Sequence, residues 1–386
     1  MERQQRQLQG RRIAVALLAV AALLAMLRLR PVSVPVTAET LPSRLTDEAF
    51  WHLVTDFSEP NGFFRSDNFL SNEREYQWVL ADLTSTAGTG GVYLGVGPEQ
   101  NFTYIVALRP KLAFIVDIRR GNLDEHLLYK AFIEMSANRI EFLSRLFARQ
   151  QPADLPANAD IEELMAAYER APTSAELFDR NLAGARDWLQ QRHAFALSSD
   201  TLGGLEYVYR AFYEGGPDLS YSFPIGAFGR GGNFPTYADL MTETDGRGER
   251  RSYLASEDQY RILRDLEQNN AIIPVVGNFA GPKALRAVGG YLRAHNAAVT
   301  AFYTSNVEMY LFQQADDWKK FYGNVSTLPF HENSTFIRSV SNRGLRFRNG
   351  ASSARGSTRL GSIADLSRAF LAGRVNGYYD VIAMSR

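Results

Sequence analysis

Strand-length apolar runs alternate with stretches of helical spacing along most of the chain. The runs lie at residues 92–94, 112–116, 272–276 and 299–303, with later ones at 335–340 and 378–384. Helical spacing of apolar residues is found at 46–57, 71–83, 123–148, 201–214, 256–269, 283–294, 307–312 and 363–372. Strands that alternate with helices predict a doubly wound α/β fold with a mainly parallel, Rossmann-like sheet covered on both faces.

The rhythm also suggests how the chain is divided. Residues 1–30 form an N-terminal membrane or signal segment, and residues 31–45 form a proline-containing spacer. The α/β domain is expected at 46–386. Within it, residues from about 150 to 255 are rich in Ala and Glu and then in Gly, and they lack the strand rhythm. We expect a helical and irregular insertion there.

The N-terminal segment carries an uninterrupted apolar run at 13–27, preceded by four arginines and followed by two. The run is shorter than the roughly 20 residues that span a bilayer comfortably. We expect an uncleaved membrane anchor. A signal peptide cleaved near 36–38 and a peripheral or buried helix are the alternatives. The greater positive charge before the run favours a body outside the cytoplasm, with a cytoplasmic body as the alternative.

Composition excludes several kinds of chemistry. The 386 residues include no cysteine, so disulfides, thiolate nucleophiles and cysteine zinc sites are excluded. The formal net charge is zero, and no basic stripe with interleaved aromatic residues is present, so we expect no nucleic-acid partner. The five histidines are scattered through different predicted elements, and we expect no metal site.

Two glycines and an acid mark the predicted ligand site. Gly95 and Gly97 follow the first strand, and Asp117 ends the second strand about twenty residues later. In nucleotide-binding sheets, such a turn brings bare backbone and a helix N-terminus to the ligand, and the acid binds its ribose. An ion pair of Asp117 with a neighbouring arginine, Arg119 or Arg120, or a helix cap is the alternative role.

The turn departs from the dinucleotide pattern in two ways. The third glycine of that pattern would fall at Gln100, and Glu99 would place a negative charge near a pyrophosphate. A ligand with a cationic end suits the position better. The pattern therefore favours S-adenosylmethionine over a nicotinamide dinucleotide.

Longer stretches carry a family resemblance. They are Ser58-Glu59-Pro60, Asp67-Asn68 and Ser71-Asn72-Glu73, together with the segments at 91–102, 112–120, 275–286 and 301–308. In these stretches the chain resembles an uncharacterised bacterial family with a class I S-adenosylmethionine-dependent methyltransferase-like fold. Tyr93 stands where the general methyltransferase pattern has an acid, and Glu99 where it has a third glycine.

The resemblance implies roles for single residues. Gly95 and Gly97 would lie under the methionine part of S-adenosylmethionine, with Asp117 on the ribose hydroxyls. The neighbouring residues expected to bind the cofactor are Glu99, Gln100, Asn101, Ser71 and Asn72. For Ser71 and Asn72, a helix cap is the alternative.

On the acceptor side, the resemblance points to the end of the strand at 299–303. Asn306 would orient the methyl acceptor through its amide, and Glu308 would act as general base. The alternative is that Ser305 or Asn306 caps the following helix.

Three functions follow from these features. The first is methyl transfer from S-adenosylmethionine to an acceptor that the sequence does not specify. The second is a non-catalytic, membrane-anchored binding protein on a degenerate methyltransferase scaffold, which a body outside the cytoplasm favours because S-adenosylmethionine is made inside. The third, a nicotinamide-dependent oxidoreductase, is disfavoured by the charge of Glu99.

Overall fold

The computed structural model describes residues 39–156, 158–221, 234–340 and 357–386. The predicted membrane segment at 13–27 and most of the spacer lie outside these residues. No helix within the described ranges is long and apolar enough to cross a membrane.

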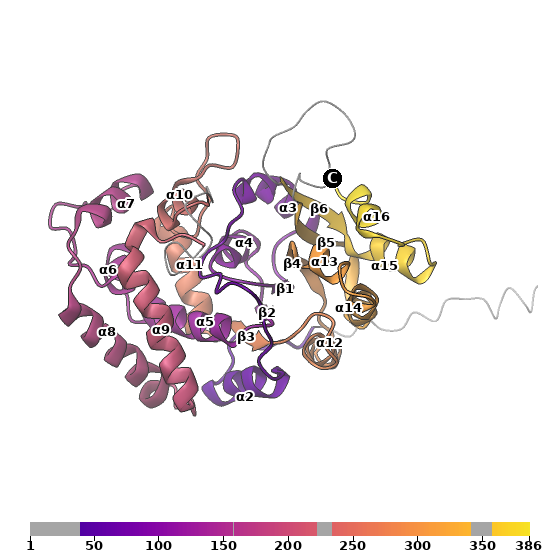
Figure 1. The fold of residues 1–386 in the computed structure, drawn as a ribbon, viewed down its shortest axis with the longest axis horizontal. Coiled ribbons are helices and arrows are strands. Elements are labelled where there is room, and N and C mark those ends of the chain that lie inside the picture. Colours follow the sequence, from indigo (N-terminus) through magenta and orange to yellow (C-terminus); the bar gives the residue numbers. More distant parts are fainter. Residues whose placement is uncertain (1–38, 157, 222–233, 341–356) are drawn as a thin grey trace, which may run out of the picture. The chain divides into compact units, whose positions relative to one another are not determined.

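A six-stranded sheet forms the centre of the fold, in the order β3-β2-β1-β4-β5-β6 (Figure 1). Its strands are β1 (Val92–Gly95), β2 (Leu112–Asp117), β3 (Ile272–Val276), β4 (Val299–Ser305), β5 (Phe330–Val340) and β6 (Ser357–Ser362). All neighbouring strands are parallel except β5 and β6, which are antiparallel. The predicted mainly parallel sheet is confirmed.

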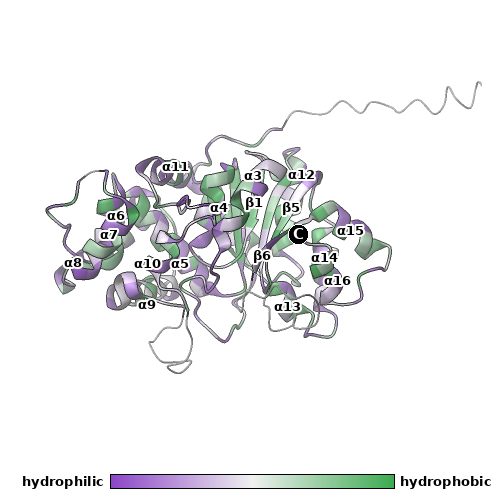
Figure 2. Ribbon diagram, turned by 90° about the horizontal axis from the view of Figure 1, so that it is seen from above, coloured by the Kyte–Doolittle hydropathy of each residue, from purple (hydrophilic) through white to green (hydrophobic). Residues whose placement is uncertain are grey.

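Both faces of the central strands are covered. Every residue of β1, β2 and β3 is buried. Successive side chains of a strand point to opposite faces, so burial at every position requires packing on both sides. This explains why these strands read as continuous apolar runs and not as alternating ones. Figure 2 shows hydrophobic residues concentrated in the sheet, whereas peripheral helices such as α11 (Glu257–Gln268) are mostly hydrophilic.

Helices connect and flank the strands. Before β1 the chain forms α2 (Asp47–Phe57), the 3₁₀ turn η1 (Tyr76–Val79) and α3 (Leu80–Ala87). The connections β1–β2, β3–β4 and β4–β5 contain α4 (Gln100–Leu108), α12 (Ala284–Ala294), and α13 (Val307–Leu311) with α14 (Asp317–Val325). After β6 come α15 (Ile363–Leu371) and α16 (Tyr378–Ala383).

The connection from β2 to β3 is much longer than the others. It contains α5 (Arg120–Glu134), α6 (Arg139–Phe147), α7 (Ile161–Arg170), α8 (Ala175–Asp187), the π turn η2 (Trp188–Arg192), α9 (Ser199–Gly215), η3 (Gly216–Asp218), α10 (Tyr237–Thr242) and α11. In Figure 1, α6 to α9 lie together to the left of the sheet, and α9 packs against α5. The helices α7 to α10 occupy the region, from about 150 to 255, where the sequence predicts an insertion.

Three sequence-based predictions of local structure are wrong. The helix predicted at 71–83 begins only at Tyr76, as the 3₁₀ turn η1, and continues as α3. The last apolar run, predicted as a strand at 378–384, is the helix α16. Its first turn is stabilised by Asp380, whose Oδ2 accepts the backbone N–H groups of Asn376 and Gly377 at 2.7 and 3.1 Å. The single helix predicted at 123–148 is two helices, because Asn138 caps the second one by accepting the Glu141 N–H at 2.9 Å.

Candidate functional site

A cavity of about 320 Å³ lies at the carboxyl ends of the parallel strands. Its lining includes residues that follow β1, β2, β3 and β4, among them Gly97, Asp117, Gly277 and Ser305. From β1 the chain builds the sheet outward through β2 and β3. It then returns to place β4 on the opposite side of β1, so the strand order reverses between β1 and β4. Open α/β sheets bind ligands in the crevice at such a switch point.

The turn after β1 is held in place by Asn101. Its Nδ2 donates to the carbonyl oxygens of Val96, Gly97 and Pro98 at 3.0, 3.2 and 2.7 Å. Its Oδ1 accepts from the Tyr93 hydroxyl at 2.8 Å. Asn101 is fully buried and is not among the lining residues, so it shapes the predicted site without contacting a ligand in the cavity.

The two predicted glycines have different physical roles. A Cβ at Gly95 would lie 2.0 Å from Asn101 Oδ1, so Gly95 makes room for the residue that braces the turn. Gly97 has a φ of +80°, which favours glycine, and a Cβ there would meet no atom within 4 Å. Of the two, only Gly97 is among the lining residues.

Glu99 is fully buried and is not among the lining residues. Burial raises its pKa to about 8, so the carboxyl is protonated at neutral pH. The negative charge on which the sequence-based argument against a pyrophosphate rested is therefore absent. A choice between ligands has to come from the side chains that face the cavity.

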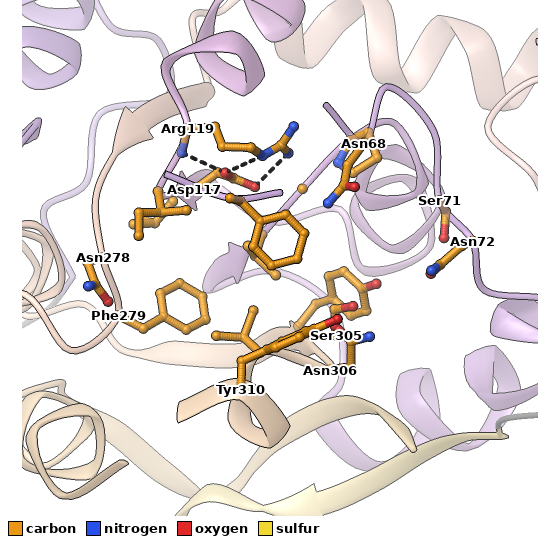
Figure 3. Close-up of a pocket in the computed structure, with 18 of the residues that line it drawn as sticks. Asn68, Ser71, Asn72, Asp117, Arg119, Asn278, Phe279, Ser305, Asn306 and Tyr310 are labelled. Carbon is orange, nitrogen blue, oxygen red and sulfur yellow. Dashed lines mark hydrogen bonds and ion pairs between the residues drawn. The ribbon is translucent and has the colours of Figure 1, made fainter. Parts of the chain in front are cut away.

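Asp117 lines the cavity and forms an ion pair with Arg119, the alternative that the sequence had left open. Its Oδ1 accepts from the Arg119 backbone N–H at 2.8 Å and from Nε at 3.1 Å, and Oδ2 accepts from a terminal nitrogen at 3.0 Å (Figure 3). The two side chains are only 7% and 10% exposed. A carboxylate has about four lone-pair sites, so Asp117 can still accept hydrogen bonds from a ligand.

A second polar wall comes from the end of β4 and from α4. Gln100 donates from Nε2 to the Tyr303 hydroxyl, and Ser305 donates from Oγ to Glu73. Ser305 has a φ of +50°, an uncommon backbone conformation for a residue other than glycine. In Figure 3, Ser305 and Asn306 lie across the cavity from Asp117.

Asn306 reaches the cavity, as the sequence predicts. It occupies the N-cap position of α13, but its side chain makes no capping hydrogen bond. Ser71 and Asn72 also line the cavity. Ser71 Oγ accepts the backbone N–H of Glu73 at 3.0 Å, within a turn that precedes the first helical residue at Tyr76.

Glu308 is not among the lining residues, and its carboxylate faces a buried arginine. Oε2 lies 2.6 Å from Arg338 Nε, and Oε1 accepts from a terminal nitrogen of Arg338 at 3.2 Å and from the Tyr322 hydroxyl at 2.8 Å. Both members of the ion pair are 1% exposed. The predicted role of Glu308 as general base finds no support in this geometry.

The sequence analysis missed several lining residues. Glu73 lines the cavity and is 6% exposed, although the sequence analysis assigned a cofactor contact only to its neighbours Ser71 and Asn72. Aromatic side chains form much of the remaining surface: Phe64 and Tyr310 meet edge to face at 5.4 Å, and Phe279 lies near them in the lining. Phe63, 85% exposed, stands at the opening. For Phe63, Phe64 and Glu73, the position next to the polar residues at 65–72 was the available signal.

The charges of the lining are mainly negative. Among the described residues, the lining contains three carboxyl groups, on Glu73, Asp117 and Asp317, and one cation, Arg119, which is already bound to Asp117. The described part of the chain contains no group of three or more His, Asp or Glu side chains that could hold a metal ion.

Comparison with known proteins places most of the chain in a family. The model of a family described as a domain of unknown function, DUF7790, matches residues 68–359, about three quarters of the chain. The matched span contains both polar walls of the cavity. No curated protein matches the sequence.

Proposed function

We propose that this chain, which belongs to the DUF7790 family, binds S-adenosylmethionine in the cavity and is a methyltransferase-like protein. One observation carries the proposal. The Gly97 turn after β1 and Asp117 at the end of β2 line the same cavity at the switch point of a mainly parallel sheet. The strand order and the burial of both sheet faces support the finer proposal of a doubly wound, class I methyltransferase-like fold.

The proposed orientation of the ligand follows from the two ends of the cavity. The ribose hydroxyls would lie at the Asp117 carboxylate, whose Oδ2 keeps one acceptor site beyond the three that Arg119 uses. The methionine part would lie over Gly97, where the absence of a side chain leaves open space. The apolar side chains of Ile118 and Phe279, in the same lining, would contact the adenine.

The charge of the lining supports S-adenosylmethionine over a dinucleotide. A pyrophosphate carries two negative charges and needs cationic or N–H partners. Arg119, the cation among the described lining residues, is committed to Asp117. S-adenosylmethionine has a sulfonium, an ammonium and one carboxylate, and its net positive charge suits a lining with three carboxyl groups and one cation among the described residues.

For methyl transfer, the protein has to position an acceptor. When bound, the sulfonium supplies an activated methyl group, so alignment of the acceptor accounts for much of the rate. Asn306 lines the cavity, and its amide is not used for helix capping. We propose that Asn306 orients the acceptor. Glu308, enclosed by Arg338 and Tyr322, is not part of this proposal.

Calorimetric titration of the full-length chain with S-adenosylmethionine tests the proposal. Asp117→Asn is expected to weaken binding about tenfold or more, because a hydrogen bond to a charged group contributes about 1.5–3 kcal/mol and tenfold corresponds to about 1.4 kcal/mol. Absence of binding to the wild-type chain at millimolar ligand, or an unchanged affinity in Asp117→Asn, would contradict it.

Asp245→Asn is the matched control. Asp245 is 5% exposed, like Asp117, and it also accepts from an arginine side chain and from the backbone N–H two residues ahead. It is not among the lining residues of the cavity. Its replacement should therefore disturb a similar local structure and leave the affinity for S-adenosylmethionine unchanged.

A second candidate function is a non-catalytic, membrane-anchored binding protein on the same scaffold. The arginine-flanked apolar run at 13–27 favours it, because a body outside the cytoplasm would not meet S-adenosylmethionine. A reporter fused to the C-terminus separates the two. Activity of a reporter that works only outside the cytoplasm would support the second candidate and count against methyl transfer.

A further inference from the structure

Glu73 is a buried acid in the lining of the cavity, and one of its carboxyl oxygens has no hydrogen-bond partner among the described residues. It lines the cavity and is 6% exposed. One oxygen, Oε1, accepts a hydrogen bond from Ser305 Oγ. The other, Oε2, is buried and makes no hydrogen bond to any described residue. A buried polar atom without a hydrogen-bond partner lowers stability by about 1–3 kcal/mol. A ligand that supplies this partner would recover the lost free energy.

The hydroxyl-bearing side chains that surround Glu73 are uncharged in the empty cavity. Burial raises the pKa of the carboxyl, and the hydroxyls of Ser305, Tyr303 and Ser339 lower it by less. The other titratable groups near it are tyrosines of β1, α4 and α16, namely Tyr93, Tyr104 and Tyr378, and burial raises the pKa of each one, so they carry no charge at neutral pH.

The charged groups of the lining come from other elements. Asp117 and Arg119 compensate each other at the end of β2, and Asp317 lies at the start of α14. None of these residues is among the groups that shift the pKa of Glu73. A cation that enters the cavity would therefore find Glu73 without a competing counter-ion.

We propose that Glu73 recognises the cationic centre of the ligand. The inference rests on the proposed function for the identity of the ligand, S-adenosylmethionine, whose cations are a sulfonium and an ammonium. Below the empty-state pKa of the carboxyl, formation of this charge pair releases the carboxyl proton to solvent. Tyr93 stands where the general methyltransferase pattern has an acid, so the acid that binds the cation would come from another part of the chain, at Glu73.

The direction of the pH effect follows from linkage. In the empty cavity burial holds the pKa of Glu73 above its ordinary value, and a bound cation lowers it because opposite charges attract strongly at low dielectric. Affinity for the cationic ligand should therefore rise with pH until the empty-state pKa is passed, and then level off. A neutral hydrogen-bond donor on the ligand would produce no such rise.

The test compares three ligands with the full-length chain by calorimetry in buffers of different ionisation enthalpy. S-adenosylmethionine has both cations, S-adenosylhomocysteine has only the ammonium, and methylthioadenosine has neither. At a pH below the empty-state pKa of Glu73, the wild-type chain should release a proton with S-adenosylmethionine and none with methylthioadenosine. Glu73→Gln should abolish the proton release and weaken S-adenosylmethionine about tenfold or more, while methylthioadenosine binds unchanged.

S-adenosylhomocysteine identifies the cation. Weakened binding of both amino-acid ligands in Glu73→Gln assigns the ammonium, and weakened binding of S-adenosylmethionine alone assigns the sulfonium. Unchanged binding of all three ligands, or an equal loss for all three, overturns the role of Glu73 but leaves the proposed function standing. If the wild-type chain binds none of them, the proposed function fails and this inference fails with it.

Glu243→Gln is the control for removing a carboxyl group. Glu243 also has one oxygen in a hydrogen bond, from the Glu75 N–H at 2.8 Å, and one buried oxygen without a partner among the described residues. Burial raises its pKa to about 7. It is not among the lining residues, so its replacement should leave the affinities and the proton release unchanged.

Discussion

Replacement of Glu308 by alanine should affect the stability of the protein and not the ligand site. The carboxylate holds Arg338 through two contacts of 2.6 and 3.2 Å, and it accepts a hydrogen bond from Tyr322 at 2.8 Å. Both ion-pair side chains are 1% exposed. Removal of the acid leaves the guanidinium of Arg338 buried without a counter-ion.

The expected magnitude is large compared with total stability. Removing one partner of a buried ion pair costs about 3–5 kcal/mol. Domains are stable by only about 5–15 kcal/mol, so Glu308→Ala should lose at least about a fifth of the free energy of unfolding. Urea unfolding of the full-length chain, followed by circular dichroism, measures this loss.

A double variant separates a structural role from a catalytic one. Joint replacement of Glu308 by Leu and Arg338 by Met removes both charges and should recover much of the lost stability, because paired buried charges contribute little beyond well-packed apolar residues. Its affinity for S-adenosylmethionine should equal that of the wild type. A Glu308→Ala chain of unchanged stability that has lost ligand binding would refute this reasoning and return Glu308 to the site.

Two further predictions concern the turn and the acid stability. Gly97→Ala should destabilise the fold by about 1–2 kcal/mol in thermal unfolding, because φ is +80°, whereas Gly121→Ala, in α5 with open space around it, should not. Burial raises the pKa values of Asp47 and Glu134, but hydrogen bonds and charges, including those from His193, outweigh it and leave both lowered. The stabilisation by the two carboxylates is therefore full above their ordinary pKa values of 3.8 and 4.5 and is lost as the pH falls through the lowered values. In urea unfolding at several pH values, His193→Gln should lose less of its free energy of unfolding on acidification than the wild type.

The sheet was predictable from the sequence where strands are buried on both faces. The strands β1 to β4 are short apolar runs with glycine or polar residues at their ends, and this pattern is strong. The strand β6 was missed because its sequence, from Ser357 to Ser362, is mostly polar and its pairing is only with β5, at the edge of the sheet. The segment of α16 was predicted as a strand because of its apolar composition. It is a helix because capping by Asp380 stabilises its first turn.

The site was predictable from the topology where it depends on strand ends, whereas Ser71, Asn72 and Gln100, which also line the cavity, were expected only from the resemblance. Gly97, Asp117 and Asn306 follow three different parallel strands, so their meeting at one edge follows from the topology. Glu73 belongs to the segment before β1, and its approach to Ser305 depends on tertiary packing between residues far apart in the sequence. The burial of Glu99, which removes its charge, likewise has no local signal.

The structure of the full-length chain bound to S-adenosylmethionine would test the proposed site most directly. The ribose hydroxyls should lie within hydrogen-bond distance of the Asp117 carboxylate, with the methionine part over Gly97 at the switch point between β1 and β4. A ligand that occupies another part of the chain, or whose ribose faces away from Asp117, would contradict the proposal.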